Sequence, residues 1–338
     1  MTTIAINGFG RIGRLFFKAA LQEKSFSVKA INDLGDIENL AYLLRYDTAY
    51  GRFDEEVSVK NGELIVGKTR VPFLQEKDPT QLPWKKLGID VVIESTGAFE
   101  SFEKAAVHLT AGAKRVVLTA PAKDADTATA RTVLSGINDM SLKGATITSN
   151  GSCTTNAAAP VIQVLSNDPG IEKAILSTVH GYTTTQSLVD GPVRGTDYRR
   201  GRAAGQNITP SSTGAARTVA KVIPELAGKF DGISLRVPVV TGSIVDITFI
   251  AKRRTTKEEV NTILRNAAAR SEWKGILSVS DEQLVSSDII GEPFGAIVDL
   301  ASTTVVDGTL VKVLAWYDNE AGYVSTLIRH VKAVAGLL

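Results

Sequence analysis

The sequence predicts an α/β protein in which a doubly wound parallel sheet precedes an α+β domain with a mixed, largely antiparallel sheet. Two observations lead to this prediction. In the first part of the chain, short β-branched runs alternate with helical patterns, which is typical of parallel strands joined by right-handed crossovers. After residue 152 the expected strands are longer and many alternate apolar with polar residues, which indicates a sheet with one covered face. A chain of 338 residues with 43% hydrophobic residues suits two globular domains.

The first domain is expected to consist of strand, helix and strand units. Short apolar runs predict strands at residues 3–7, 28–32, 91–94 and 116–119. Apolar residues at helical spacing predict helices over residues 14–22 and 103–111. Residues 57–73 alternate and are broken at Asn61, Gly62 and Gly67, which predicts antiparallel hairpins inserted into this domain.

The second domain is expected to begin near residue 152 and to contain longer strands. These strands are predicted at residues 174–180, 233–252, 296–302 and 310–317. Residues 181–208 are polar, rich in Gly, Thr and Arg, and lack a clear period, so we expect a long loop with a functional or interface role. Residues 322–338 are apolar at helical spacing and predict a terminal helix.

Charge and composition exclude several classes of partner. The 38 basic and 36 acidic residues give a net charge of +2, which is too balanced to indicate nucleic acid or a membrane surface. The N-terminus lacks a signal peptide pattern and no apolar run approaches a membrane span, so we expect a cytoplasmic protein. One cysteine and three scattered histidines predict neither an internal disulfide nor a bound metal.

A glycine-rich loop follows the first predicted strand. Gly8, Gly10 and Gly13 form G-x-G-x-x-G at the start of a helix, and Asp33 ends the next strand. Such glycines allow a pyrophosphate to approach the helix N-terminus, and the acid accepts hydrogen bonds from ribose hydroxyls while repelling a 2′-phosphate. The loop therefore predicts dinucleotide binding, with NAD preferred over NADP. The alternative is that the glycines only form a turn and that Asp33 only ends a strand.

Cys153, the single cysteine, begins a predicted helix. Ser152 or a neighbouring threonine is a plausible N-cap, and the helix N-terminus favours the reactive thiolate. Pro160 is expected to kink this helix or to distort its first turn. His180 ends a predicted strand and enters the long polar loop, so we interpret it as the base that activates Cys153. The alternative is a buried structural cysteine, which is common in protein cores.

Nine short segments together resemble one family. They include INGFGRIGR at 6–14, SCTTN at 152–156 and WYDNE at 316–320, with further matches at residues 31–33, 95–97, 178–180, 202–204, 210–216 and 236–238. In this order, and over essentially the whole chain, they resemble the phosphorylating glyceraldehyde-3-phosphate dehydrogenases. Within that family, the fold class is a Rossmann-type NAD-binding domain and a catalytic domain.

The resemblance implies a covalent reaction. Cys153 would attack glyceraldehyde 3-phosphate to form a thiohemiacetal, and His180 would accept a proton as hydride passes to NAD. Inorganic phosphate would then attack the remaining thioester and release 1,3-bisphosphoglycerate. The phosphate of the aldehyde would be held by Thr183 and Arg236. The attacking phosphate would be held by Ser152, Thr154, Arg200, Thr213 and Gly214, although Arg199 and Arg202 are close enough to replace Arg200.

The resemblance also implies the remaining cofactor contacts and the assembly. Residues implied at the cofactor are Arg11 and Ile12 at the pyrophosphate, Asp33 at the ribose, Lys77 and Thr119 near the adenosine half, and Asn319 at the carboxamide. The cofactor domain would span residues 1–152 and 319–338, and the catalytic domain residues 153–318. A homotetramer is implied, with the polar loop at a subunit interface.

Three alternative functions are less consistent with these residues than the function that the resemblance implies. An erythrose-4-phosphate dehydrogenase would use water in place of phosphate, but residues 180–183 and 213–214 favour the triose enzyme. A thiol hydrolase would need no cofactor, which leaves the glycine loop and Asp33 unexplained. A non-catalytic dinucleotide-binding or RNA-binding protein is disfavoured by the balanced charge and by the Cys153 and His180 pair.

Overall fold

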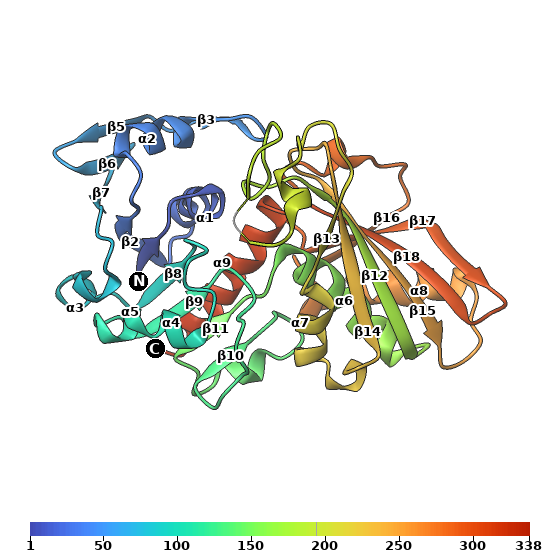
Figure 1. Cartoon of the computed structure of the whole chain (residues 1–338). Helices are drawn as coiled ribbons and strands as arrows, with labels where there is room; N and C mark the ends of the chain where they lie inside the picture. Colours follow the sequence, from blue (N-terminus) through green and yellow to red (C-terminus); the bar gives the residue numbers. More distant parts are fainter. Residues whose placement is uncertain (194) are drawn as a thin grey trace. The chain divides into compact units, whose positions relative to one another are not determined.

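The structure is a computed structural model that describes residues 1–193 and 195–338 (Figure 1). The described chain divides into two compact units. Unit 1 comprises Met1–Gly151 and Leu327–Leu338, and unit 2 comprises Ser152–Thr326. The segment 319–326 thus groups with unit 2, which differs from the expected return of the chain at residue 319. In unit 2, the Asn319 amide oxygen accepts hydrogen bonds from the hydroxyls of Ser243 and Thr241.

Unit 1 contains a nine-stranded sheet with the order β10-β11-β9-β8-β1-β2-β7-β6-β5. Its strands from β10 to β7 are all parallel, and the predicted α/β class is confirmed here. The parallel strands are β1 (Thr2–Asn7), β2 (Phe26–Asn32), β7 (Thr69–Leu74), β8 (Val91–Glu94), β9 (Arg115–Leu118), β10 (Ala130–Thr132) and β11 (Ile147–Ser149). β5 (Val57–Lys60) and β6 (Glu63–Val66) form the predicted hairpins with β7. Because β7 also pairs with β2, the hairpins extend the main sheet instead of forming a separate insert. A small separate pair consists of β3 (Tyr46–Asp47) and β4 (Gly51–Arg52).

The helices of unit 1 are short apart from the first. α1 (Arg11–Gln22) buries Phe16 and Phe17 and packs against β2. α2 (Ile37–Arg45) is capped by Asp36, and α3 spans Trp84–Leu87. The single helix predicted over residues 103–111 is wrong in detail, since α4 (Phe102–Ala105) and α5 (Val107–Thr110) are separated at Ala106.

Unit 2 contains a seven-stranded mixed sheet with the order β13-β14-β12-β15-β18-β17-β16. Its strands are β12 (Ile171–Gly181), β13 (Thr209–Ser212), β14 (Phe230–Val237), β15 (Ser243–Ala251), β16 (Leu277–Ser280), β17 (Ala296–Val306) and β18 (Leu310–Tyr317). β12 is parallel to β14 and β16 to β17, and the other neighbours are antiparallel. The strand predicted over residues 233–252 is instead two strands, because the chain turns between Val237 and Ser243, where Gly242 has a φ of +86°.

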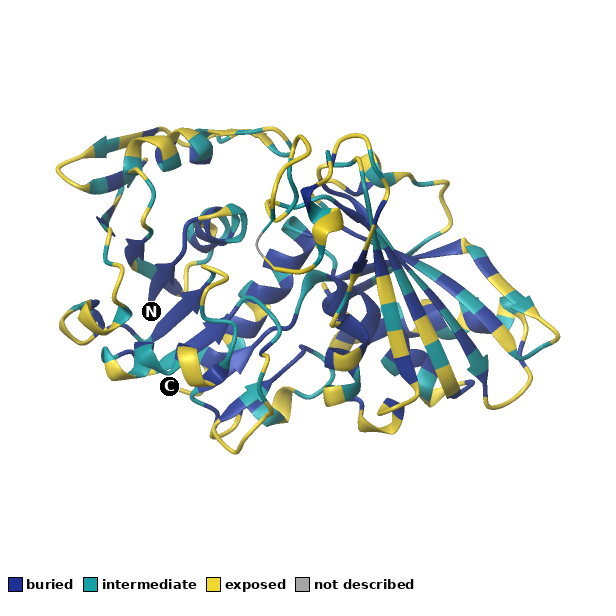
Figure 2. Cartoon of the chain, in the orientation of Figure 1, coloured by how far each residue is buried: buried dark blue, intermediate teal, exposed yellow. Residues whose placement is uncertain are grey.

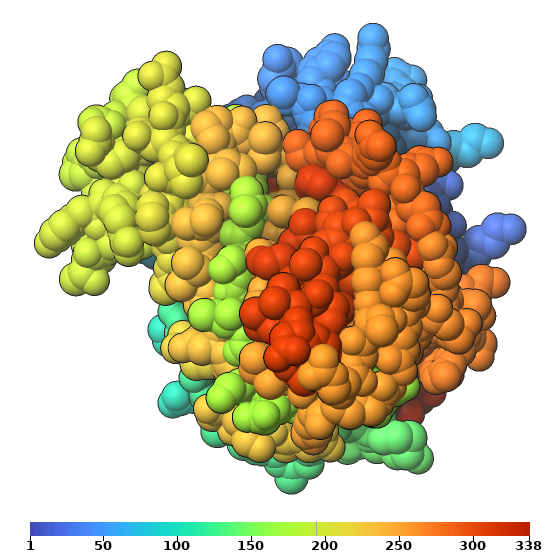
Figure 3. Space-filling view, turned by 90° about the vertical axis from the view of Figure 1, so that its right-hand side faces the viewer, coloured from blue at the N-terminus to red at the C-terminus, as the bar shows by residue number. Residues whose placement is uncertain are grey.

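One face of this sheet is covered by helices and the other is open. α6 (Cys153–Asn167), α7 (Ala215–Val222) and α8 (Lys257–Ala268) contact the sheet, and along β15 every second residue is buried (Figure 2). The open face exposes Ile175, Ile233 and Leu310, and strand residues from several segments of the chain reach the surface in Figure 3.

The remaining helical segments connect these elements. α9 (Ala321–Ala335) begins in unit 2 and ends in unit 1. The 3-10 helices are η1 (Pro79–Gln81), η2 (Asp139–Leu142), η3 (Tyr198–Gly201), η4 (Pro224–Leu226), η5 (Ser271–Trp273) and η6 (Ser286–Ile289). In the part of the chain that the structure describes, no helix is both long enough and apolar enough to cross a membrane.

Candidate active site

The thiol of Cys153 lies at the first residue of α6. Ser152 caps this helix as the sequence predicts, with its Oγ accepting a hydrogen bond from the Thr155 N–H at 3.1 Å. The thiol therefore lies at the positive end of the helix dipole, which favours a developing negative charge there. α6 runs unbroken from Cys153 to Asn167 with Pro160 inside it, so the proline leaves the first turn and its cap in place.

His180 and Arg236 meet Cys153 from neighbouring parallel strands. In the register of β12 and β14, His180 lies opposite Arg236. His180 Nε2 is 3.4 Å from Cys153 Sγ. On the other side of the ring, Nδ1 is 2.6 Å from the Gly181 carbonyl oxygen and 2.7 Å from Arg236 Nη1. The ring thus has a partner for either neutral tautomer, since Nδ1 can donate to Gly181 or accept from Arg236.

Burial and charge act together on the titration of this pair. Burial, and then the positive charge of Arg236, lower the pKa of His180 to about 3. Burial also raises the pKa of the Cys153 thiol, whereas the Arg236 charge and the Thr154 N–H act in the opposite direction. His180 is therefore a neutral imidazole near pH 7, which is the form that a proton acceptor needs.

Tyr317, at the end of β18, supports both members of the pair. Its hydroxyl bridges the hydroxyls of Thr154 at 2.9 Å and Thr178 at 2.8 Å. Its ring meets the His180 ring edge-on, with the centroids 6.0 Å apart. Burial raises the pKa of Tyr317 above its usual range, so the hydroxyl stays protonated and can donate. Sequence reasoning missed this residue, although a tyrosine at a buried position of an alternating strand signals a required hydrogen-bond partner.

The other residues expected to hold phosphate do not all present their side chains in the same way. Thr154 is 4% exposed and its hydroxyl is 2.9 Å from that of Tyr317, so its side chain is engaged inside the protein. Thr183 is half-buried and bonds Thr185. Gly214 begins α7 as its N-cap, and the Thr213 hydroxyl accepts from the Ala215 N–H at 3.2 Å.

Among the three candidate arginines of the polar loop, Arg200 is the one directed inward. Its side chain is 31% exposed, and it donates to Ser211 at 2.8 Å and to Thr185 at 3.0 Å. Arg199 and Arg202 are 59% and 63% exposed and pair with nearby aspartates. The charge of Arg200 also acts on Arg236, and burial together with this repulsion lowers the pKa of Arg236.

In unit 1, the glycine loop has the geometry that a pyrophosphate requires. Gly8 has a φ of +96°, and a Cβ there would lie 2.6 Å from the Ser95 backbone. A Cβ on Gly13 would lie 2.1 Å from the Gly8 carbonyl oxygen. At Gly10 nothing lies within 4 Å of a Cβ, and no side chain caps the start of α1. Backbone atoms therefore pack closely against the loop at Gly8 and Gly13, whereas the side at Gly10 leaves space. That space fits a phosphate at the N–H groups of the helix.

The remaining cofactor candidates are held by specific bonds. Asp33 accepts from the Phe9 N–H at 2.6 Å and from the Gly35 N–H at 2.8 Å, which orients its carboxylate beside the glycine loop. Arg11 pairs with Asp47 at 2.7 Å, and Ile12 follows it in the first turn of α1. The other three candidates are Lys77, which is exposed, Thr119, which donates to the Glu94 carbonyl, and Asn319, whose amide is oriented by Ser243 within unit 2. Among residues 1–193 and 195–338, no group of acidic, histidine or cysteine side chains could hold a metal ion.

The chain is similar to known proteins in both of its units. Residues 2–102 match the family model "Glyceraldehyde 3-phosphate dehydrogenase, NAD binding domain", and residues 152–319 match that of the C-terminal domain. Proteins named glyceraldehyde-3-phosphate dehydrogenase are similar to the whole chain. The one from Clostridium pasteurianum is 45% identical, with 99% of both chains covered, and the one from Geobacillus stearothermophilus is 47% identical, with 95% of this chain and 94% of the relative covered. The chain therefore belongs to the glyceraldehyde 3-phosphate dehydrogenase family.

Proposed function

We propose that this chain oxidises glyceraldehyde 3-phosphate with NAD and inorganic phosphate to give 1,3-bisphosphoglycerate. The observation that carries the proposal is the contact between Cys153 Sγ and His180 Nε2 at 3.4 Å, at the N-terminus of α6. A nucleophile within reach of a base, at the N-terminus of a helix, suits covalent catalysis on a carbonyl carbon. A thioester formed in this way retains the free energy of the oxidation, so phosphate can convert it into an acyl phosphate.

The proposed steps start from one neutral tautomer of His180. With the proton on Nδ1, His180 donates to Gly181, and Nε2 faces the sulfur as a proton acceptor. Nε2 accepts the thiol proton as Cys153 attacks the aldehyde carbon, and the first N–H groups of α6 stabilise the oxyanion that forms. His180 then returns this proton to the oxyanion, which becomes the hydroxyl of the thiohemiacetal. His180 takes the hydroxyl proton as the carbon is oxidised to the thioester. Bound NAD supplies the hydride acceptor for this oxidation. Phosphate then attacks the acyl carbon, and Cys153 leaves as thiolate.

The substrate and the attacking phosphate each need an anion site in unit 2. Arg236 is proposed to hold the phosphate of the aldehyde together with Thr183. Arg200, the Ser152 hydroxyl and the groups at Thr213 and Gly214 are proposed to hold inorganic phosphate. Arginine forks, hydroxyls and free N–H groups are the usual donors to phosphate oxygens. Support comes from the inward direction of Arg200 and from the backbone N–H of Gly214 at the start of α7.

We further propose a homotetramer in the cytoplasm. The assembly is supported by the open face of the seven-stranded sheet, where Ile175, Ile233 and Leu310 are exposed, because exposed apolar side chains gathered on one face mark protein interfaces. The location is supported by the free Cys153, whose proposed chemistry requires a reduced thiol. Light scattering of the purified chain tests the assembly, and a monomeric mass contradicts it.

A steady-state assay tests the proposed reaction. NADH should appear from glyceraldehyde 3-phosphate and NAD, the rate should depend strongly on added phosphate, and Cys153→Ser should abolish it while still binding NAD. Ser166→Ala, a substitution in the same helix, serves as the control and should retain the rate. Turnover that is independent of phosphate would contradict the phosphorylating step, and an active Cys153→Ser variant would contradict the covalent mechanism.

A further inference from the structure

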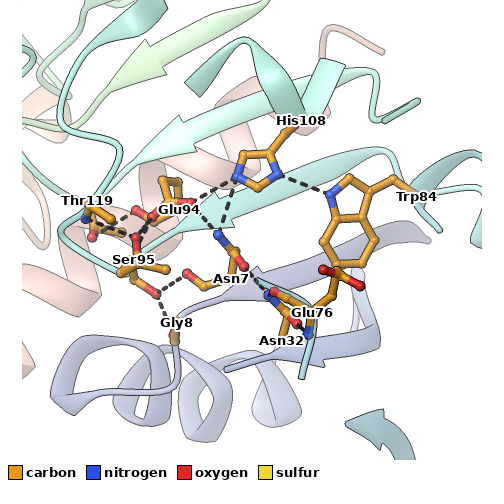
Figure 4. A network of polar contacts seen from close by, with 11 residues as sticks. Asn7, Gly8, Asn32, Glu76, Trp84, Glu94, Ser95, His108 and Thr119 are labelled. Atoms are coloured by element: carbon orange, nitrogen blue, oxygen red, sulfur yellow. Dashed lines mark hydrogen bonds and ion pairs between the residues drawn. The ribbon is translucent and has the colours of Figure 1, made fainter. Parts of the chain in front are cut away.

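Buried polar side chains of unit 1 form a connected network, and none of its members is among the residues implied at the cofactor. We call it the Glu94 network; it consists of Trp84, His108, Glu94, Asn7 and Asn32 (Figure 4). Every member is 5% exposed or less. Polar groups buried to this extent are costly unless each donor and acceptor is paired.

Glu94 is the centre of this network. Its Oε2 accepts from Asn7 Nδ2 at 2.6 Å and from His108 Nε2 at 2.9 Å. Its Oε1 accepts from the Thr96 N–H at 2.8 Å and from the Thr96 hydroxyl. A carboxyl side chain has about four lone-pair sites, so these four donors occupy the acceptor capacity of Glu94 and fix both of its oxygens.

The tautomer of His108 is set by Trp84. The Trp84 indole N–H donates to His108 Nδ1 at 3.2 Å, and an indole nitrogen can only donate. His108 Nδ1 must therefore be unprotonated, and the ring proton lies on Nε2, directed at Glu94. Trp84 and His108 thus act together as one preoriented donor to the carboxylate.

The other arm of the network leads to the loop that carries Lys77. Asn7 Oδ1 accepts from Asn32 Nδ2 at 2.7 Å. Asn32 in turn forms two bonds with the backbone of Glu76, donating to its carbonyl at 3.0 Å and accepting from its N–H at 2.9 Å. Since each amide group has partners on both sides, the orientation of Asn7 and of Asn32 is determined along the whole arm.

The network fixes the loops at the carboxyl ends of neighbouring parallel strands. The Glu94 side chain holds Thr96. The backbone carbonyl of Glu94 accepts hydrogen bonds from the N–H and the hydroxyl of Thr119, at 3.0 and 3.1 Å. Ser95 Oγ donates to the Gly8 carbonyl at 2.7 Å, which ties the glycine loop to the same segment. In sheets of this type the ligand binds at the carboxyl ends of the strands. Glu94 therefore lies under the turns that surround the dinucleotide site.

We propose that Glu94 is a positioning residue for the adenosine half of the dinucleotide. Its side chain holds the turn at Thr96 and, through Asn7 and Asn32, the turn before Lys77. Without the Glu94 side chain, the glycine loop and α1 keep their conformation, but the neighbouring turns at Thr96 and before Lys77 lose the hydrogen bonds that fix their positions. This inference rests on the proposed use of NAD and adds a residue that need not touch the cofactor.

The decisive variant is Glu94→Gln, which keeps the shape and exchanges one acceptor oxygen for a donor. In either amide orientation, the new NH₂ group faces two existing donors. We expect the dissociation constant of ADP-ribose, measured by calorimetry, to rise at least tenfold. The KM for NAD should rise in parallel, while kcat at saturating NAD stays within twofold. Glu100→Gln, at the surface ion pair with Lys123, is the matched control and should leave the affinity unchanged.

A second substitution separates positioning from general loss of structure. When Asn7→Asp is combined with Glu94→Gln, the donor and the acceptor exchange places, so the new amide can donate to the new carboxylate. The double variant should recover at least threefold of the lost affinity, although each single variant binds ADP-ribose weakly. Recovery is expected to be partial, because the His108 N–H still faces the new amide group. The alkylation rate of Cys153 in unit 2 should be the same in all folded variants.

The outcomes separate this inference from the proposed function. If the unaltered chain bound neither NAD nor ADP-ribose, both would fail. If it bound both ligands and Glu94→Gln bound them equally well, or if the double variant showed no recovery, only the positioning role would be overturned. Should Glu94→Gln not be recovered folded, Asn32→Ala cuts only the arm to Glu76 and must weaken ADP-ribose at least threefold; unchanged affinity would overturn the inference as well.

Discussion

Replacing Arg236 with glutamine should raise the pKa of the Cys153 thiol. Arg236 Nη1 is 2.7 Å from His180 Nδ1, and His180 Nε2 is 3.4 Å from the sulfur, so one imidazole ring separates the guanidinium from the thiol. Charges about 8 Å apart at an effective dielectric constant of about 20 interact by about 2 kcal/mol, which equals about 1.5 pKa units. Because the charge of Arg236 opposes the effect of burial on the thiol, its removal moves the pKa of Cys153 upward.

The assay is the rate of alkylation of Cys153 by iodoacetamide as a function of pH, without substrate. In Arg236→Gln, the midpoint of the profile should shift by about one pKa unit or more to higher pH. Arg217→Gln removes the same charge from α7 in the same unit and should shift the midpoint by far less. A midpoint that does not move in Arg236→Gln, or that moves equally in the control, would refute the electrostatic reasoning.

Three further outcomes are expected. Burial lowers the pKa values of His180 to about 3 and of His330 to about 4, below the value of 6.5 in the unfolded chain, so the unfolded state binds more protons below pH 6.5 and stability falls as pH falls. As the pH is lowered from about 7.5 to about 5, each histidine should reduce the free energy of unfolding by about 2 kcal/mol, measured by urea unfolding. A free energy of unfolding that stays constant over this range would contradict the neutral buried state. Gly13→Ala should abolish NAD binding measured by calorimetry, because a Cβ would lie 2.1 Å from the Gly8 carbonyl oxygen; normal affinity would show that the loop adapts. Asp33→Ala should reduce the preference for NAD over NADP in kinetic assays by about tenfold or more, and an unchanged ratio would place the source of selectivity elsewhere.

Features that depend on neighbouring residues were predictable from the sequence. The glycine loop between β1 and α1 and the cap of α6 by Ser152 were both expected, because turn chemistry and capping act within a few residues. The two-sheet fold class was likewise expected from the change in strand pattern. The split of the predicted strand at 233–252 was missed, although Pro238 within it is a residue that interrupts strands.

Features that depend on strand register were not predictable from the sequence. The parallel pairing of β12 with β14 places Arg236 opposite His180, and the sequence pattern did not specify that pairing or its register. The Glu94 network joins Asn7 to a residue 87 positions later, and both read simply as ends of buried strands. The residues around Cys153 and His180 are also compatible with a buried structural cysteine, and only the similarity of the whole chain to a family favours the pair over that alternative.

The most direct test of the central claim is the detection of an acyl group on Cys153. The chain is mixed with glyceraldehyde 3-phosphate and NAD in the absence of phosphate, quenched in acid, and digested for mass spectrometry. The proposed mechanism predicts an acyl adduct on the peptide that contains Cys153, and it predicts that this adduct disappears when phosphate is added before the quench. NADH formation without any adduct on that peptide, or an adduct that phosphate does not remove, would contradict the account.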